Sequence, residues 1–286
     1  MLLPNMVTLL ALCSGLTAIR MAVEGRFEWA IYGILASAVL DGIDGRIARL
    51  LRSTSRFGAQ LDSLADFVSF GVAPAILLFA WSLSDLGSAG WVVGMVFAIC
   101  AALRLARFNS ALDGPAKPAW QGAYFVGVPA PAGAVIAMLP IYVEFIGAPH
   151  GFFTAWVALA YTVLVAFLMV SRVPTFSGKH IGQRIPRDLV LPIFLALVVF
   201  TALLVSFPWW VLTVCTIIYL GVLPLSWRSF EATRRTVTGE PLRASDAPMR
   251  EVAEEPEPLR LEPPPRNRSG PRRERSVRKS RPQNLQ

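Results

Sequence analysis

The sequence has little charge for its length. Of its 286 residues only 16% are Asp, Glu, Lys or Arg, whereas 54% are hydrophobic. A soluble domain would carry about a quarter charged residues, and the mean hydropathy of this chain is +0.52. These values exclude an ordinary soluble globular protein and predict an integral membrane protein.

Cysteine and histidine are also scarce, with three and two residues. Cys13, Cys100 and Cys215 stand far apart inside apolar runs, so no disulfide framework is indicated and buried, inert thiols are expected. His150 and His180 have no further metal ligand at useful spacing. The N-terminus lacks the basic region of a secretory signal, so its apolar run is interpreted as a retained first helix.

Long apolar runs predict an all-α fold of about eight transmembrane helices, since about 20 residues cross the hydrocarbon core. The predicted helices are 7–23, 28–50, 59–82, 90–108, 127–147, 152–171, 188–206 and 209–227. Lys and Arg gather in the connections after the second, fourth and sixth helices, whereas those after the third, fifth and seventh hold none. Only Arg20 and Arg26, in the first connection, oppose this bias. The positive-inside rule therefore predicts that both termini, and a polar cavity, face the cytoplasm.

The composition changes after the last apolar run. Residues 1–227 are interpreted as a membrane-embedded domain and residues 228–286 as a Pro-rich, basic cytoplasmic tail that stays disordered. The tail could be attracted to anionic lipid headgroups, at about 1 kcal/mol per basic residue near the surface. The alternative is a solubilising tail without a partner. Nucleic acid is not an expected partner.

Four aspartates lie between the second and third apolar runs. Helical periodicity places the first two on one face of the second helix and the last two one turn apart on the third: Asp41, Asp44, Asp62 and Asp66. An ionised side chain at mid-membrane costs about 2.5–3.5 kcal/mol, so four such groups require bound cations. A pair of divalent metal ions, and hence phosphate chemistry, is the simplest solution. The alternative is pairing of single aspartates with neighbouring arginines, such as Asp41 with Arg49.

The spacing of these aspartates resembles a family signature. The order Asp-x-x-Asp-Gly-x-x-Ala-Arg, eight residues, Gly-x-x-x-Asp-x-x-x-Asp is similar to that of the CDP-alcohol phosphatidyltransferases. It is carried here by Asp41, Asp44, Gly45, Ala48, Arg49, Gly58, Asp62 and Asp66. A match at eight fixed positions is not expected by chance, so the resemblance is specific. It covers about residues 4–227 and leaves the tail outside.

The resemblance implies roles for these residues. The four aspartates would hold two divalent cations, Mg²⁺ or Mn²⁺, and Asp66 would also take the proton of the attacking alcohol as general base. The residues implied to bind CDP-diacylglycerol are Asn5, Thr8, Gly45, Ala48, Arg49, Ser55 and Gly58. The family resemblance further implies a homodimer in the bacterial inner membrane.

Four further segments resemble the branch of the family that uses serine as acceptor alcohol. They are DSLADFVSFGVAPA (62–75), LRLARFN (103–109), GVPAPAGA (127–134) and SRVPTFSGK (171–179). L-serine is therefore the predicted second substrate. The residues predicted to bind serine or a lipid phosphate are Arg104, Arg107, Asn109 and Lys179, although ordinary positive-inside anchoring would also explain the cationic ones.

Two alternatives to this function stay open. Glycerol 3-phosphate, inositol phosphate or choline could be the acceptor in the same chemistry. A cation-coupled transporter could also use intramembrane carboxylates. A transporter, however, gives no reason for the spacing of Gly, Ala and Arg within the motif, and no internal repeat is evident.

Overall fold

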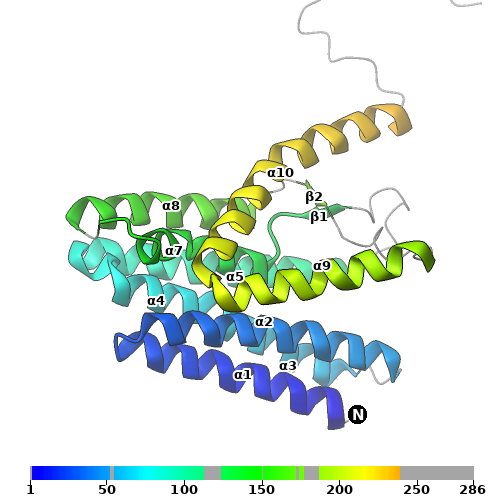
Figure 1. The fold of residues 1–286 in the computed structure, drawn as a ribbon, viewed down its shortest axis with the longest axis horizontal. Coiled ribbons are helices and arrows are strands. Elements are labelled where there is room, and N and C mark those ends of the chain that lie inside the picture. Colours follow the sequence, from blue (N-terminus) through cyan, green and yellow to red (C-terminus); the bar gives the residue numbers. More distant parts are fainter. Residues whose placement is uncertain are drawn as a thin grey trace, which may run out of the picture. The chain divides into compact units, whose positions relative to one another are not determined.

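A computed structural model describes residues 2–51, 55–112, 124–149, 151–171, 174–176 and 187–238. All of these residues belong to one compact unit, Met1–Glu240. Figure 1 shows its elements, which are α1 (Leu2–Val23), α2 (Phe27–Leu50), α3 (Arg56–Asp66), η1 (Phe67–Val72), α4 (Ala73–Trp81), η2 (Leu83–Leu86), α5 (Ser88–Leu112), β1 (Tyr124–Val126), α6 (Ala130–Ala137), α7 (Leu139–Phe145), α8 (Phe152–Val170), β2 (Pro174–Phe176), α9 (Arg187–Ser206) and α10 (Pro208–Thr238).

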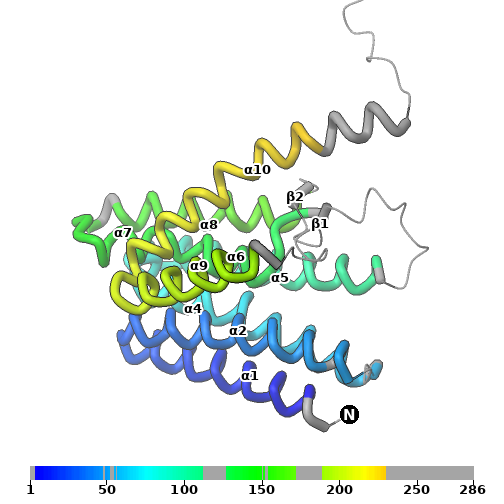
Figure 2. Tube along the Cα trace, turned by 45° about the vertical axis from the view of Figure 1, so that its right-hand side comes forward, coloured from blue at the N-terminus to red at the C-terminus, as the bar shows by residue number. Residues whose placement is uncertain are grey.

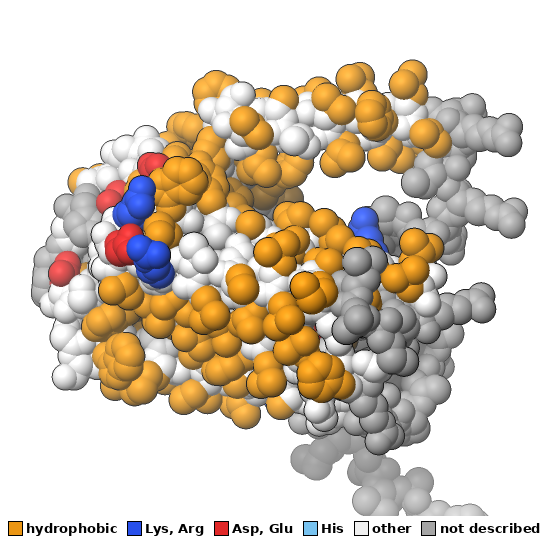
Figure 3. Space-filling model, turned by 90° about the horizontal axis from the view of Figure 1, so that it is seen from below, with side chains coloured by type: hydrophobic (Ala, Val, Ile, Leu, Met, Phe, Trp, Pro, Cys, Tyr) orange, Lys and Arg blue, Asp and Glu red, His pale blue; other side chains and the backbone are white. Residues whose placement is uncertain are grey.

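The helical class predicted from the apolar runs is confirmed, because helices coincide with all eight predicted segments. Five stretches are long and apolar enough to cross a membrane: Pro4–Val23, Phe57–Trp81, Ser88–Ala111, Leu189–Ser206 and Pro208–Ser229. The helices Ala130–Phe145 and Thr154–Val170 are apolar but shorter, and α2 carries the first two aspartates. The count of eight crossings is therefore not confirmed. Figure 3 shows one face of the molecule covered broadly by hydrophobic side chains, with most of the charged side chains on that face gathered near one margin.

The two N-terminal helices form a closely packed antiparallel pair. A Cβ on Gly33 of α2 would lie 2.9 Å from the Cβ of Ala18 on α1, so the two backbones approach as only small residues allow. Two hydroxyls cross the interface: Ser14 donates to the carbonyl of Gly33 at 2.8 Å, and Ser37 donates to that of Ala11 at 2.9 Å. This pair fixes the end of α2 that carries Asp41 and Asp44.

The third predicted helix is continuous but contains a wider turn. Pro74 has no N–H to donate to the carbonyl of Phe70, and the chain before it adopts a π-helical turn, η1, directly after Asp66. There the N–H of Ala73 donates to the carbonyl of Val68, five residues back. Such turns occur frequently at functional sites. Because of this wider turn, the orientation of the end of α3 is not fixed by that of α4.

Helix α5 packs against this turn. A Cβ on Gly71 would lie 3.1 Å from that of Ala101, so η1 and α5 are close neighbours. On α5, Arg104 lies one helical turn after Ala101, and Asp66 lies five residues before Gly71, where η1 begins. Helix α5 also packs against α8, and Figure 2 traces both helices.

The predicted helix 127–147 is two helices with an irregular start. Pro129 precedes α6, and Pro140 stands in the first turn of α7 after a break at Met138. Gly127 has φ 79°, and a Cβ there would lie 2.7 Å from the carbonyl oxygen of Met169, so glycine is required. The preceding strand β1 pairs antiparallel with β2, Phe125 opposite Thr175, and β2 packs against α10.

Two expectations need correction. Helix α10 continues to Thr238, past the predicted start of the tail at 228; the sequence there lacks proline or glycine before Gly239, so nothing ends the helix earlier. Residues 239–286 lie outside the described residues. The cysteines are not all buried, since Cys13 and Cys215 are exposed. Apolar helices facing lipid do not need a protein partner for such side chains.

Candidate active site

Three of the four motif aspartates meet at one point. Asp41 comes from α2, and Asp62 and Asp66 from α3; each offers a carboxylate oxygen, and these oxygens all lie within 4.8 Å of one another. Carboxylates at such separations repel one another unless a proton or a cation lies between them, and oxygen ligands are those that Mg²⁺ and Mn²⁺ prefer. The cluster could therefore hold a metal ion.

Asp44 lies one turn further along α2, outside that triad. Its side chain is only 4% exposed, and its Oδ2 atom is buried without a hydrogen-bond partner among the described residues. It interacts with the Thr8 side chain and electrostatically with Asp41 and Asp62. An orphaned carboxylate oxygen beside three others fits a cation site, because a buried charge without a partner is strongly destabilising.

The polar residues predicted near the start of the chain do face the motif. Thr8 on α1 donates to the carbonyl of Pro4 at 3.1 Å and also reaches Asp44. Asn5 points to α3, since a Cβ on Gly58 would lie 3.0 Å from its Oδ1 atom. The absence of a side chain at Gly58 therefore lets α1 approach α3, which is a packing reason for this glycine.

The remaining predicted nucleotide contacts differ in their surroundings. A Cβ on Gly45 would meet no atom within 4 Å, so open space lies beside it. Arg49 is exposed and its Nε donates to the carbonyl of Gly45 at 2.9 Å. Ser55 caps α3, because its hydroxyl accepts from the N–H of Gly58 at 3.0 Å. The side chain of Ala48 lies outside the described residues.

Among the side chains that the structure describes, no motif aspartate forms a salt bridge with an arginine, which was the alternative to a metal site. Among the described side chains the only salt bridge joins Arg20 and Glu24, at 2.7 Å and at the other end of α1. The side chain of Arg56 is outside the described residues. Among the described cations, Arg104 interacts electrostatically with Asp66.

The sequence was compared with known proteins. Residues 1–168, more than half of the chain, match the family described as CDP-alcohol phosphatidyltransferase. The chain belongs to the CDP-alcohol phosphatidyltransferase family. Residues 188–224, which cover α9 and the first part of α10, match a second description, CDP-alcohol phosphatidyltransferase 2.

The curated relatives of this family member carry one recurring substrate in their names. The CDP-diacylglycerol–serine O-phosphatidyltransferase of Mycobacterium leprae is 40% identical over 228 residues, 79% of this chain and 74% of that protein. The Helicobacter pylori protein of the same name (strain 26695) is 34% identical over 200 residues, 69% of this chain and 81% of that protein. The archaetidylserine synthase of Methanothermobacter thermautotrophicus is 32% identical over 176 residues, 60% of this chain and 68% of that protein.

Within this phosphatidyltransferase, the four residues predicted to bind serine do not form one group. Arg104 is half-buried, interacts with Asp66, and its guanidinium lies 5.4 Å from the centre of the Phe108 ring. Arg107 is exposed and donates to the carbonyl of Val170 at the end of α8, at 2.6 Å. Asn109 donates to the hydroxyl of Ser63 at 2.8 Å. Lys179 lies outside the described residues.

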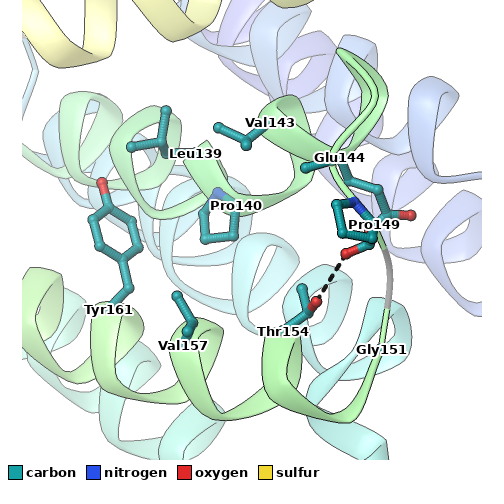
Figure 4. Close-up of a pocket in the computed structure, with 10 residues that line it drawn as sticks. Leu139, Pro140, Val143, Glu144, Pro149, Gly151, Thr154, Val157 and Tyr161 are labelled. Carbon is teal, nitrogen blue, oxygen red and sulfur yellow. Dashed lines mark hydrogen bonds between the residues drawn. The ribbon is translucent and has the colours of Figure 1, made fainter.

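A cavity of about 570 Å³ lies away from the aspartates, between α7 and α8. Figure 4 shows its lining, with the hydroxyl of Thr154 donating to the carbonyl of Pro149 at 3.1 Å. The one acidic group, Glu144, accepts from the indole N–H of Trp81 at 2.9 Å. Because the lining is mostly apolar and holds none of the motif residues, this cavity is not the phosphatidyltransferase site.

One polar residue near the site was not predicted. Tyr219 on α10 interacts electrostatically with Arg104. A single tyrosine inside an apolar helix has no distinctive sequence signal. Only the spacing of Thr216, Tyr219 and Ser226 along one helical face could have drawn attention to it.

Proposed function

We propose that this phosphatidyltransferase transfers the phosphatidyl group of CDP-diacylglycerol to the hydroxyl of L-serine, giving phosphatidylserine and CMP. The observation that carries the proposal is the meeting of Asp41, Asp62 and Asp66 within 4.8 Å. The serine in the names of relatives up to 40% identical supports the choice of acceptor.

The proposed reaction is a displacement at the phosphatidyl phosphorus. The serine oxygen forms a bond to that phosphorus, the bond to the bridging oxygen of CMP breaks, and CMP leaves with the electron pair. Asp66, in the role of general base, takes the hydroxyl proton, a role that requires hydrogen-bond reach to the hydroxyl. Asp66 is suited to it by its place at the end of α3, where η1 begins.

We further propose that Asp41, Asp44, Asp62 and Asp66 hold two divalent ions, Mg²⁺ or Mn²⁺. When bound, such ions neutralise the charge of the pyrophosphate and of the leaving group. The residues of the chain supply the rest. The side chain of Thr8 interacts with Asp44, and the open space beside Gly45 gives the nucleotide access to the backbone of α2.

The chain is a multi-pass membrane protein by its apolar helices, and we propose that it lies in the bacterial inner membrane with both termini and the aspartates on the cytoplasmic side. The distribution of Lys and Arg supports this orientation. We also propose a homodimer. The exposed apolar surface of α9, of which none of the span Leu189–Ser206 is buried, needs lipid or a second copy to cover it.

The test uses the full chain purified in detergent, with CDP-diacylglycerol, Mn²⁺ or Mg²⁺, and a panel of acceptors. CMP release that depends on L-serine, with phosphatidylserine as the lipid product, is the expected result. Release with glycerol 3-phosphate, inositol phosphate or choline and not with serine would overturn the choice of acceptor. No release with any of the four would contradict the transferase reaction itself.

A further inference from the structure

The inward face of α10 carries buried hydroxyl groups that have no hydrogen-bond partner in the part of the chain that the structure describes. Most helical hydroxyls in this protein donate to the carbonyl four residues back, as Thr162, Thr201 and Thr213 do at 2.7–2.8 Å. The hydroxyls of Thr216, Tyr219 and Ser226 are buried and have no hydrogen-bond partner among the described residues. They are three and seven residues apart and so share one face of the helix.

Unpartnered hydroxyls are unfavourable in an apolar protein interior, and more so in a membrane, where water cannot satisfy them. Five described hydroxyls are buried without a partner; three of them lie along this one face of α10, and the other two, those of Ser69 and Ser82, lie elsewhere in the fold. Three such hydroxyls on one helical face favour a polar ligand that approaches this face. Such a ligand would contact both α10 and the helices that face it.

Tyr219 connects this face to the aspartates through one cation. Arg104 on α5 interacts electrostatically both with Asp66 on α3 and with Tyr219 on α10. Arg104 is half-buried, and among the described residues it forms no salt bridge and no hydrogen bond that would occupy its donors. A guanidinium that interacts with Asp66, and a phenol O–H that interacts with that guanidinium, are therefore available to a ligand.

We propose that Tyr219 and Arg104 together bind the carboxylate of the acceptor amino acid. The inference rests on the proposed function and adds to it a specificity-determining residue from α10. Arg104 donates N–H groups to one or both carboxylate oxygens, and the Tyr219 hydroxyl donates to one of them. Arg104 also brings the amino acid beside Asp66, within reach of the general base.

This arrangement selects against alcohols without a carboxylate. Such an acceptor would leave the guanidinium and the phenol desolvated without a partner, and sites built to hydrogen-bond a substrate group reject analogues that lack it. The second family match, residues 188–224, includes Tyr219. The part of the chain that this match covers would then contribute to the choice of acceptor and not only to the lipid-facing surface.

The experiment compares Tyr219→Phe with Tyr161→Phe in the full chain. Tyr161 is the matched control, because it is a half-buried tyrosine on α8 whose hydroxyl donates to the carbonyl of Ile136 at 3.0 Å, remote from the aspartates. KM and kcat are measured with L-serine and with serinol, which has the amino and hydroxyl groups of serine but no carboxylate. KM for CDP-diacylglycerol reports on the integrity of the rest of the site.

For Tyr219→Phe we expect KM for L-serine to rise about tenfold or more, since hydrogen bonds to charged groups are of that strength. The preference for L-serine over serinol should fall by a similar factor, with kcat and KM for CDP-diacylglycerol nearly unchanged. Tyr161→Phe should change none of these. An unchanged KM and preference, or an equal rise in both substrates' KM values, would overturn the inference. Absence of serine-dependent CMP release in the wild-type protein would instead overturn the proposed function.

Discussion

Asp41 on α2 and Asp66 on α3 place carboxylate oxygens within 4.8 Å of each other. This pair joins the two helices that flank the Leu50–Arg56 connection and defines where the site lies. Two carboxylates adopt this position when something positive lies between them. The consequences of that arrangement can be measured on single variants.

Replacing the proposed base tests its role directly. Asp66→Asn keeps the size of the side chain but cannot take a proton, so we expect kcat to fall by about 10²–10⁴-fold, the usual contribution of a general base. Binding of CDP-diacylglycerol should be largely kept. Asp85→Asn is the matched control, because Asp85 is exposed in η2, away from the motif. Near-normal turnover in Asp66→Asn would defeat the assignment.

Asp44 is expected to contribute to metal binding and not to removal of the proton from the serine hydroxyl. Asp44→Asn removes a charge from a buried position whose Oδ2 atom has no partner among the described residues. We expect the Mn²⁺ concentration for half-maximal activity to rise by about tenfold or more, since even a group that only supports a metal ligand contributes about 10–100-fold to affinity. Titration of activity with Mn²⁺ after chelation measures it. If the half-maximal concentration stays the same and only kcat falls, Asp44 has a different role.

Alanine substitutions at Gly42 and Gly45 distinguish an effect on nucleotide binding from an effect on the stability of α2. A Cβ at either Gly45 or Gly42 would meet no atom within 4 Å, so alanine should fit at both and stabilise α2 by up to about 1 kcal/mol. Only Gly45→Ala should raise KM for CDP-diacylglycerol, by about tenfold or more, because its methyl group enters the proposed nucleotide space. Equal KM values for the two variants would show that the nucleotide does not approach Gly45.

Arg104 and Arg107 are expected to differ although both are cationic and close in sequence. Arg104→Gln should raise KM for serine by about tenfold or more, since a charge-assisted hydrogen bond is lost. Arg107→Gln loses a hydrogen bond to the carbonyl of Val170 and should reduce stability by about 1 kcal/mol while keeping KM. Thermal unfolding and serine saturation curves measure both. The reverse pattern would move the serine site to the end of α8.

Much of this arrangement could be predicted from the sequence. Apolar runs placed every long helix, because length and hydropathy are what the membrane requires. The helical periodicity of the motif correctly brought Asp41 together with Asp62 and Asp66. Asp44 was expected in the same group but lies outside the triad, a turn away toward Thr8.

Other features had no signal in the sequence. Strands of three residues, Tyr124–Val126 and Pro174–Phe176, are too short for a period of two to be recognised. Exposure of Cys13 and Cys215 was missed because lipid replaces a protein core. Arg107 and Asn109 were grouped with Arg104 by sequence proximity, yet they contact α8 and α3 through separate hydrogen bonds.

The binding of divalent ions by the aspartates is the claim on which the account depends. Electron paramagnetic resonance of Mn²⁺ added to the purified, metal-free protein in detergent counts bound ions without requiring turnover. We predict two bound ions per chain in the wild-type protein, and loss of binding in the variant with both Asp41→Asn and Asp62→Asn. A folded wild-type protein that binds no Mn²⁺, or a double variant that binds as the wild type does, would contradict the account.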